Sequence, residues 1–155
     1  MRTETRFEDG DLIVERTYAA PRADVFEAWI ETSRVQAWWG CGQTKSVRST
    51  VEPRAGGRYE HVMQVEGAGE IPMRGTITLY EPPARLAFEL SAPFPTPDGR
   101  PMRVSVSFTE VPGGTRVRLV QSGLPEPFRA PVTGGWTAGF DRLARHLAEP
   151  TAVLR

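Results

Sequence analysis

GGWTAGFDRLARHLAEP, residues 134–150, carries large apolar side chains at the period of an α-helix. The apolar face is formed by Trp136, Phe140, Leu143 and Leu147. Offsets of three and four residues place such side chains on one side of a helix. Pro150 is expected to end this helix, whereas Pro and Gly residues at positions 131–135 leave its beginning open. The stretch therefore predicts a long C-terminal helix that covers an apolar surface made by the rest of the chain.

The middle of the chain, residues 47–119, has apolar side chains at alternate positions, which is the period of a β-strand. Gly and Pro pairs at residues 56–57, 82–83 and 113–114 separate the alternating runs and favour turns. A Pro-rich segment, residues 93–101, is expected to form a longer loop. About six strands in this order predict an antiparallel meander with one covered face and one wet face.

One strand and two short helices are expected before the meander. Residues 12–18 are rich in β-forming side chains, and Pro21 suits the first turn of a helix. A second short helix is expected from residue 32 or 33 to Trp38. Only the C-terminal helix is long enough to cover the apolar face of the sheet. The order predicts an α+β helix-grip fold: a curved antiparallel sheet wrapped around the long C-terminal helix, with two short helices after the first strand.

Several short motifs follow one another along nearly the whole chain. They are Ala20-Pro21 with Val25-Phe26 and Trp29, Trp38-Trp39-Gly40, Gly56-Gly57-Arg58-Tyr59 with Met63, Arg74-Gly75, residues 81–86, and Gly135-Trp136 with Leu143 and Leu147. Together they resemble the START-like (SRPBCC, birch-pollen-allergen-like) superfamily, and within it the bacterial branch named for the activator of the heat-shock protein 90 ATPase. The resemblance implies the helix-grip fold in one domain, residues 1–155, with its core at about residues 11–149. This superfamily includes lipid carriers, polyketide cyclases, resistance proteins and chaperone cofactors, so the resemblance selects no single activity.

Charge and cysteine content limit the partners of the protein. The 155 residues include 19 basic and 19 acidic side chains, so no global basic field favours nucleic acid or an anionic membrane surface. No run approaches the roughly 18 apolar residues of a membrane span, so no membrane insertion is expected. Cys41 is the single cysteine, and no cluster of His or carboxylate side chains has metal-ligand spacing. We expect no metal and no cofactor.

The first eleven residues are charged and lack the apolar run of a signal peptide, so a cytoplasmic protein is expected. The sequence leaves open whether the chain is a monomer or a homodimer.

The fold predicts a mainly apolar cavity between the sheet and the C-terminal helix, open near the small helices. Ten side chains are expected around it: Trp39, Tyr59, His61, Met63, Arg74, Ile77, Phe88, Val106, Trp136 and Phe140. Each of them can instead fill the core and leave no void, because protein interiors pack densely. Gly139 leaves room on the helix, either for a close approach to a strand or for a ligand.

Two polar members of this set have alternative interpretations. A neutral His61 can bind a ligand carbonyl or act as a general base, or it can be a core histidine that a neighbouring carbonyl satisfies. Arg74 can clamp a carboxylate or phenolate, but its alternation with Thr76 and Thr78 also fits the outer face and an ion pair there.

Three functions are consistent with these observations. The leading hypothesis is a protein that binds a small hydrophobic or aromatic molecule in the cavity and is more a binding protein than an enzyme. The first alternative is an enzyme of the polyketide cyclase or aromatase kind, with His61 or Tyr59 as acid or base. The second alternative, implied by the resemblance, is a cofactor of a chaperone ATPase.

Overall fold

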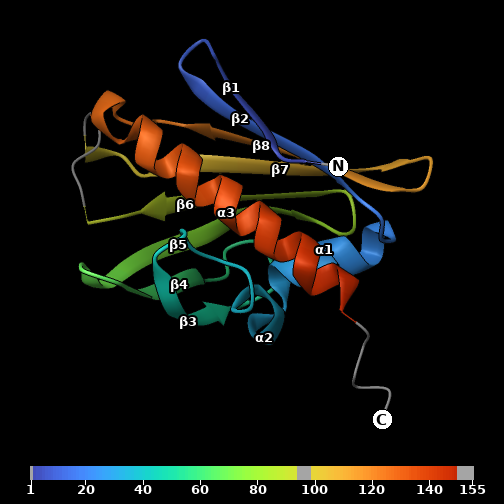
Figure 1. Cartoon of the computed structure of the whole chain (residues 1–155), viewed down its shortest axis with the longest axis horizontal. Helices are drawn as coiled ribbons and strands as arrows, with labels where there is room; N and C mark the ends of the chain where they lie inside the picture. Colours follow the sequence, from blue (N-terminus) through green and yellow to red (C-terminus); the bar gives the residue numbers. More distant parts are fainter. Residues whose placement is uncertain (1, 94–98, 150–155) are drawn as a thin grey trace.

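An antiparallel sheet of eight strands curves around one long helix in the computed structural model, which describes residues 2–93 and 99–149 (Figure 1). The elements follow in the order β1 (Glu4–Glu8), β2 (Asp11–Tyr18), α1 (Arg22–Ile30), α2 (Thr32–Val35), β3 (Thr44–Val51), β4 (Tyr59–Val65), β5 (Gly69–Glu81), β6 (Arg85–Ser91), β7 (Met102–Val111), β8 (Gly114–Ser122), the short 3-10 helix η2 (Glu126–Phe128) and α3 (Arg129–Ala148). The predicted helix-grip fold is confirmed, with α1 and α2 following β2.

The strands lie in the order β1-β2-β8-β7-β6-β5-β4-β3, and every neighbouring pair is antiparallel. Strands β3 to β8 therefore form the predicted meander, in which each strand pairs with the next one along the chain. Strand β1 precedes the predicted core and was not expected. All five of its residues are exposed, so it has no buried face that could have produced an apolar period.

Helix α3 crosses the concave face of the sheet (Figure 1). It begins at Arg129, so Pro131 lies in its first turn, where the ring displaces no intrahelical hydrogen bond. The helix buries Trp136, Gly139, Phe140 and Leu143. It ends at Ala148, and Pro150, which was expected to end it, lies outside the described residues, as do residues 94–98 of the expected loop.

Helix α2 is shorter than expected, because it ends at Val35 and turns carry the chain on to Trp38. The indole Nε1 of Trp38 donates a 2.9 Å hydrogen bond to the carbonyl of Ala28 in α1. That bond fixes the segment after α2 against the helix pair. Helices α1 and α2 and this segment together cover one end of the sheet, and they place residues 39–41 beside α3.

Two contacts fix α3 against strand β2 of the sheet. The hydroxyl of Tyr18 donates to the carbonyl of Phe140 at 3.0 Å, and both residues are buried. Close by, Arg16 Nη1 lies 2.6 Å from Asp141 Oδ1. The buried hydrogen bond between Tyr18 and Phe140 stabilises one orientation of the helix, because leaving either partner unpaired is unfavourable. The two contacts fix the position of α3 relative to the sheet. They therefore also determine the space between the first half of α3 and the opposite part of the sheet.

Candidate functional site

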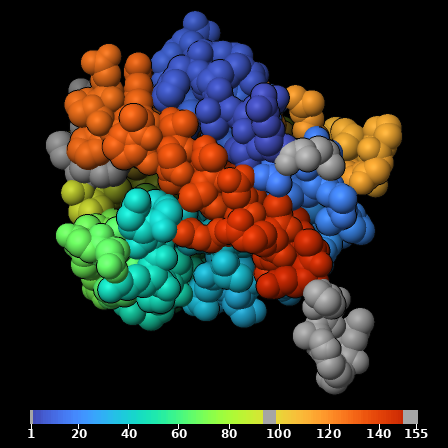
Figure 2. Space-filling view, viewed as in Figure 1, coloured from blue at the N-terminus to red at the C-terminus, as the bar shows by residue number. Residues whose placement is uncertain are grey.

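A pocket of about 320 Å³ lies between the first half of α3, the segment after α2 and the concave face of the sheet. Its lining is mainly apolar: Trp38, Trp39, Gly40, Cys41, Met63, Ile71, Met73, Leu90, Ala92, Pro93, Met102, Gln121, Phe128, Pro131, Val132, Gly135, Trp136 and Gly139. In Figure 2 α3 lies diagonally across this face, with β1 and β2 on one side and the segment that contains β3 and β4 on the other. None of the lining residues that the structure describes carries a charge.

Among the lining residues that the structure describes, Gln121 is the single carboxamide. It lies near the end of β8, is 2% exposed, and shares the inward face with Val117 and Leu119. Its Oε1 accepts a 2.6 Å hydrogen bond from the indole Nε1 of Trp136 on α3. Its Nε2 lies 3.1 Å from the sulfur of Met102 on β7. The amide thus ties the helix to the sheet beside the pocket.

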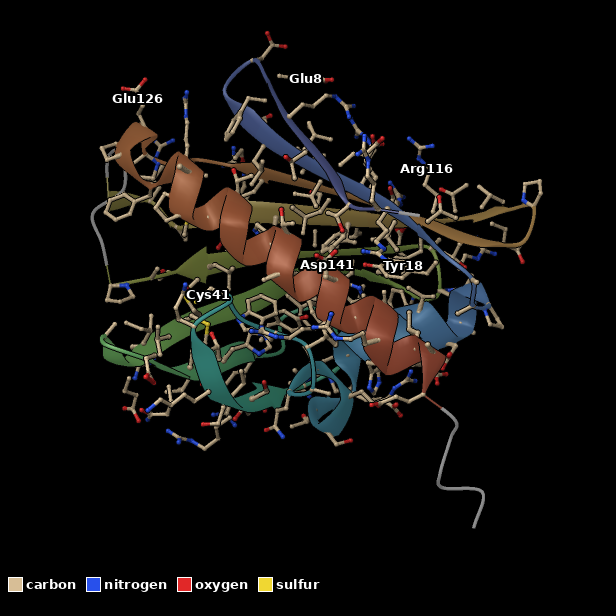
Figure 3. All side chains as sticks on the ribbon, viewed as in Figure 1. Glu8, Tyr18, Cys41, Arg116, Glu126 and Asp141 are labelled. Carbon is tan, nitrogen blue, oxygen red and sulfur yellow. The ribbon has the colours of Figure 1, made fainter. Side chains whose placement is uncertain are left out.

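The segment after α2 forms the opposite wall, and Arg142 of α3 holds it in place. The guanidinium donates through Nη1 to the carbonyl of Gly40 at 2.9 Å and through Nη2 to the carbonyl of Cys41. The Cys41 Sγ lies 3.4 Å from Thr44 Oγ1, and the same hydroxyl accepts from the Cys41 N–H at 3.0 Å. Figure 3 shows Cys41 on this segment, beside α3. A bidentate guanidinium fixes both carbonyls at once.

His61 lies on the inward face of β4 but does not line the pocket. It is fully buried and stacks on Trp39, with ring centroids 3.8 Å apart. Its Nδ1 lies 2.8 Å from the hydroxyl of Ser49, and its Nε2 has no partner among the residues that the structure describes. Burial lowers the pKa of His61 from its usual 6.5 to about 3, so the ring is neutral. The imidazole contacts the pocket wall through the indole rather than facing the cavity.

Tyr59 also lies outside the pocket lining. Its hydroxyl donates a 2.8 Å hydrogen bond to the carbonyl of Trp29 in α1, and burial raises its pKa well above the usual 10. A hydroxyl that is buried, protonated and already donating is poorly placed to act as an acid or base in the cavity.

The structure divides the ten side chains expected around the cavity into three groups. Trp39, Met63 and Trp136 line the pocket. Tyr59, His61, Ile77, Phe88, Val106 and Phe140 are buried in the core beyond it. Arg74 is exposed, which corrects its expected place at the cavity. Alternation along β5 turns Met73 into the pocket and therefore Arg74 outward.

Gly139 faces the segment after α2 rather than a strand. A Cβ atom placed there would lie 3.5 Å from the Trp38 carbonyl oxygen and 3.6 Å from that of Gly40, which is ordinary contact. The residue also lines the pocket, together with Gly135, whose added Cβ would lie 3.8 Å from the Cβ of Cys41. A methyl group would fit at either position, so the two glycines are not required for the approach of the helix, but they leave the pocket wider than larger side chains would.

Sequence reasoning missed most of the pocket wall, including Gln121, Cys41 and Met102. The available signal was a polar residue at an inward position of a strand, since Gln121 follows the alternation of Val117 and Leu119. Periodicity indicates the face of a strand on which a side chain lies. It does not indicate how far along the strand the helix leaves the sheet uncovered.

A second hollow, also of about 320 Å³, lies beside β1 and β2 and is lined by Arg2, Glu4, Glu15, Arg16, Thr17 and Arg116. Its most buried charge, Glu15, lies 2.8 Å from Arg6 and 3.0 Å from Arg116. The hydrogen bond from Arg6 is the main cause of the lowered pKa of Glu15, and burial opposes it. Because this carboxylate is already paired, we place the candidate site in the apolar pocket.

Among residues 2–93 and 99–149, no three His, Cys, Asp or Glu side chains gather as metal ligands would. Within the same ranges, no helix has the length and apolar character needed to cross a bilayer.

Comparisons with known proteins extend the fold assignment. A family model described as Activator of Hsp90 ATPase homolog 1-like protein matches residues 19–148. A search of curated proteins found no match. A solved structure from Chromobacterium violaceum has a TM-score of 0.80 at 18% identity, covering 90% of this chain and 99% of that chain. One from Rhodobacter sphaeroides has a TM-score of 0.80 at 20% identity, covering 96% and 99% respectively.

The fold is also similar to that of CalU16 from Micromonospora echinospora, with a TM-score of 0.68 at 22% identity over 96% of this chain and 87% of that chain. At these identities the solved structures establish the shared fold. The family model, which spans most of the chain including α1, the meander and α3, establishes kinship in sequence as well. The chain belongs to the family of Activator of Hsp90 ATPase homolog 1-like proteins.

Proposed function

We propose that this protein binds a small hydrophobic or aromatic molecule in the pocket between α3, the segment after α2 and the sheet. The observation that carries the proposal is a cavity of about 320 Å³ whose described lining is apolar and aromatic and contains no charge. Ligand pockets for small molecules have volumes of about 300–1,000 Å³ and walls of this character. We expect the protein to act in the cytoplasm, as a monomer or a homodimer.

The wall supplies both rigidity and apolar contact. Trp136 and Trp39 lie edge to face, with centroids 5.1 Å apart, and Trp38 lies 5.8 Å from Trp39. Indoles that pack against one another keep their rotamers in the absence of a ligand, so less conformational entropy is lost on binding. Burial of an aromatic ligand against these indoles gains about 25 cal/mol for each Å² of apolar surface removed from water.

Titration with N-phenyl-1-naphthylamine, a neutral fluorophore, tests the proposal. We expect saturable binding with a blue-shifted emission, and we expect Gly135→Leu to weaken it at least about tenfold, because the new side chain fills the pocket. Gly134→Leu is the matched control, since Gly134 is exposed and an added Cβ would meet nothing within 4 Å. Absence of binding to the parent protein, or equal binding by both variants, would contradict the proposal.

The enzymatic alternative has less support from the geometry. It requires an acid or base that faces the pocket within hydrogen-bond reach of a ligand. The hydroxyl of Tyr59 is occupied by the Trp29 carbonyl, and His61 stacks on Trp39 without lining the pocket itself. We therefore keep the binding function as the proposal.

The chaperone alternative rests on the description of the family model, which names an activator of the heat-shock protein 90 ATPase. Addition of the purified protein to a bacterial chaperone of this class, followed by measurement of ATP hydrolysis, tests it. We expect an unchanged rate. A saturable increase that Gly135→Leu does not reduce would support this alternative over ligand binding.

A further inference from the structure

The Gln121 carboxamide has one fixed orientation beside the pocket. The indole Nε1 of Trp136 can only donate, and it lies 2.6 Å from the amide, so the Gln121 oxygen must face it. The amide nitrogen, Nε2, must then point toward the sulfur of Met102, 3.1 Å away. The side of the Gln121 amide that points away from Trp136 therefore carries a nitrogen donor rather than an oxygen acceptor.

This donor is incompletely satisfied in the absence of a ligand. Nε2 carries two N–H groups, and its one partner among the residues that the structure describes is the Met102 thioether, a weak acceptor. Gln121 is 2% exposed and lines the pocket, so the second N–H can find an acceptor only from the pocket side. Buried donors almost always have an acceptor, because leaving one unpaired is unfavourable. Gln121 and Met102 both line the pocket, so an acceptor bound there can reach Nε2.

The charge of that acceptor follows from the rest of the wall. No Lys, Arg or His is among the described lining residues, and the guanidinium of Arg142 is occupied by the carbonyls of Gly40 and Cys41. A carboxylate or phosphate in the pocket would lose its hydration without gaining a counter-charge. A carbonyl or quinone oxygen accepts a weaker hydrogen bond than an anion does, but it loses far less hydration on entering the pocket.

We infer that the ligand is a neutral aromatic carbonyl compound, such as an aryl ketone, quinone or ester, whose oxygen accepts a hydrogen bond from Nε2 of Gln121. The inference rests on the proposed binding function and adds the chemical class of the ligand. Gln121 is then the specificity-determining residue of the pocket, and the tryptophans hold the aromatic body.

Competition against bound N-phenyl-1-naphthylamine tests the inference with two compounds of nearly the same shape. 2-Acetylnaphthalene carries a carbonyl where 2-isopropenylnaphthalene carries a methylene group. We expect Gln121→Met to shift the ratio of their dissociation constants about threefold to tenfold against the ketone, which is the range for one hydrogen bond. Gly134→Leu, at an exposed position outside the pocket lining, should preserve the preference for the ketone.

A readout on the parent protein covers the case in which Gln121→Met fails to fold. The carbonyl stretch of bound 2-acetylnaphthalene should lie at lower wavenumber than in cyclohexane, because a hydrogen-bonded carbonyl is weakened. An unshifted stretch, an unchanged ratio in Gln121→Met, or tighter binding of 2-naphthoate than of the ketone would overturn the inference. If N-phenyl-1-naphthylamine binds, such a result leaves the proposed function standing. If no compound binds, the proposed function fails and the inference fails with it.

Discussion

Trp39 and His61 lie ring against ring, with centroids 3.8 Å apart and planes inclined by 18°. The indole belongs to the pocket wall, whereas the imidazole is fully buried and pairs through Nδ1 with Ser49. The neutral ring therefore supports the wall and does not act in the cavity. Because His61 is buried as a neutral ring, we expect the stability of the fold to depend on pH.

We expect His61 to make the fold sensitive to mild acid. Burial lowers its pKa from 6.5 in the unfolded chain to about 3 in the folded protein. Below pH 6.5 the unfolded state binds a proton that the folded state does not, so the free energy of unfolding falls with decreasing pH until about pH 3. The slope approaches about 1.4 kcal/mol per pH unit for one proton. Urea denaturation at a series of pH values measures it.

The comparison is best made in a His146→Gln background, because the pKa of His146 is also lowered, first by burial and then by Arg34. In that background His61→Phe should flatten the dependence between about pH 6.5 and pH 5, above the range in which carboxylates titrate. An unchanged slope would show that His61 is not the group responsible.

We expect Tyr59→Phe to reduce stability by about 1–3 kcal/mol, because it leaves the buried carbonyl of Trp29 without its hydroxyl donor. Tyr80→Phe is the matched control, since Tyr80 is partly buried against Phe26 through its ring. Guanidinium denaturation of the two variants measures the difference. Equal losses would mean that the Tyr59 hydroxyl adds nothing beyond packing.

The contact of Arg142 with the segment after α2 should hold one side of the pocket in place. Arg142→Met removes both hydrogen bonds to the carbonyls of Gly40 and Cys41, and we expect a loss of about 1–3 kcal/mol in stability. Arg145→Met, an exposed position on the same helix, should change stability by less than about 0.5 kcal/mol. Faster hydrogen exchange at residues 38–44 in Arg142→Met alone would locate the effect, and similar exchange in both variants would contradict it.

Cys41 gives a direct measure of access to the pocket. Its thiol is half-buried in the wall and is the single cysteine of the chain, so its labelling is unambiguous. We expect N-phenyl-1-naphthylamine to slow the reaction with a thiol reagent severalfold, because the ligand covers the sulfur. Gly135→Leu should slow it without ligand, since the Cβ at position 135 lies 3.8 Å from the Cβ of Cys41. Equal rates with and without ligand would argue that the fluorophore binds elsewhere.

The fold could be predicted from the sequence because its apolar residues clearly follow the helical period in one part and the strand period in another. The stripe from Trp136 to Leu147 indicates a helix, and alternation such as Leu86, Phe88, Leu90 indicates a strand with one buried face. Strand β1 was not predicted because it joins the sheet by pairing with β2 and all five of its residues are exposed. Pairing through backbone hydrogen bonds alone imposes no apolar period on the sequence of a strand.

The site was accessible only in part, for a geometrical reason. Alternation correctly turns both Met63 and Tyr59 inward, but Met63 lies in the pocket wall and Tyr59 lies in the core. The difference depends on where α3 crosses the sheet, and that crossing is set by distant contacts such as that of Tyr18 with Phe140. Gln121 acquires its orientation from Trp136 in the same way. A local sequence pattern cannot predict where a helix crosses the sheet or how a side chain is oriented by a distant residue.

The position of β2 between β1 and β8 has a consequence for how the chain folds. Strands β3 to β8 pair with sequence neighbours, so their hairpins close short loops and can form early. The pairing of β2 with β8 joins Leu12 to Gln121 and Tyr18 to Thr115, across most of the chain. During synthesis β2 is made long before its partner, and Leu12 and Val14 stay without the packing of β8 until the ribosome has released residue 122. Closure of the sheet is therefore a late event that joins two segments lying far apart in the sequence.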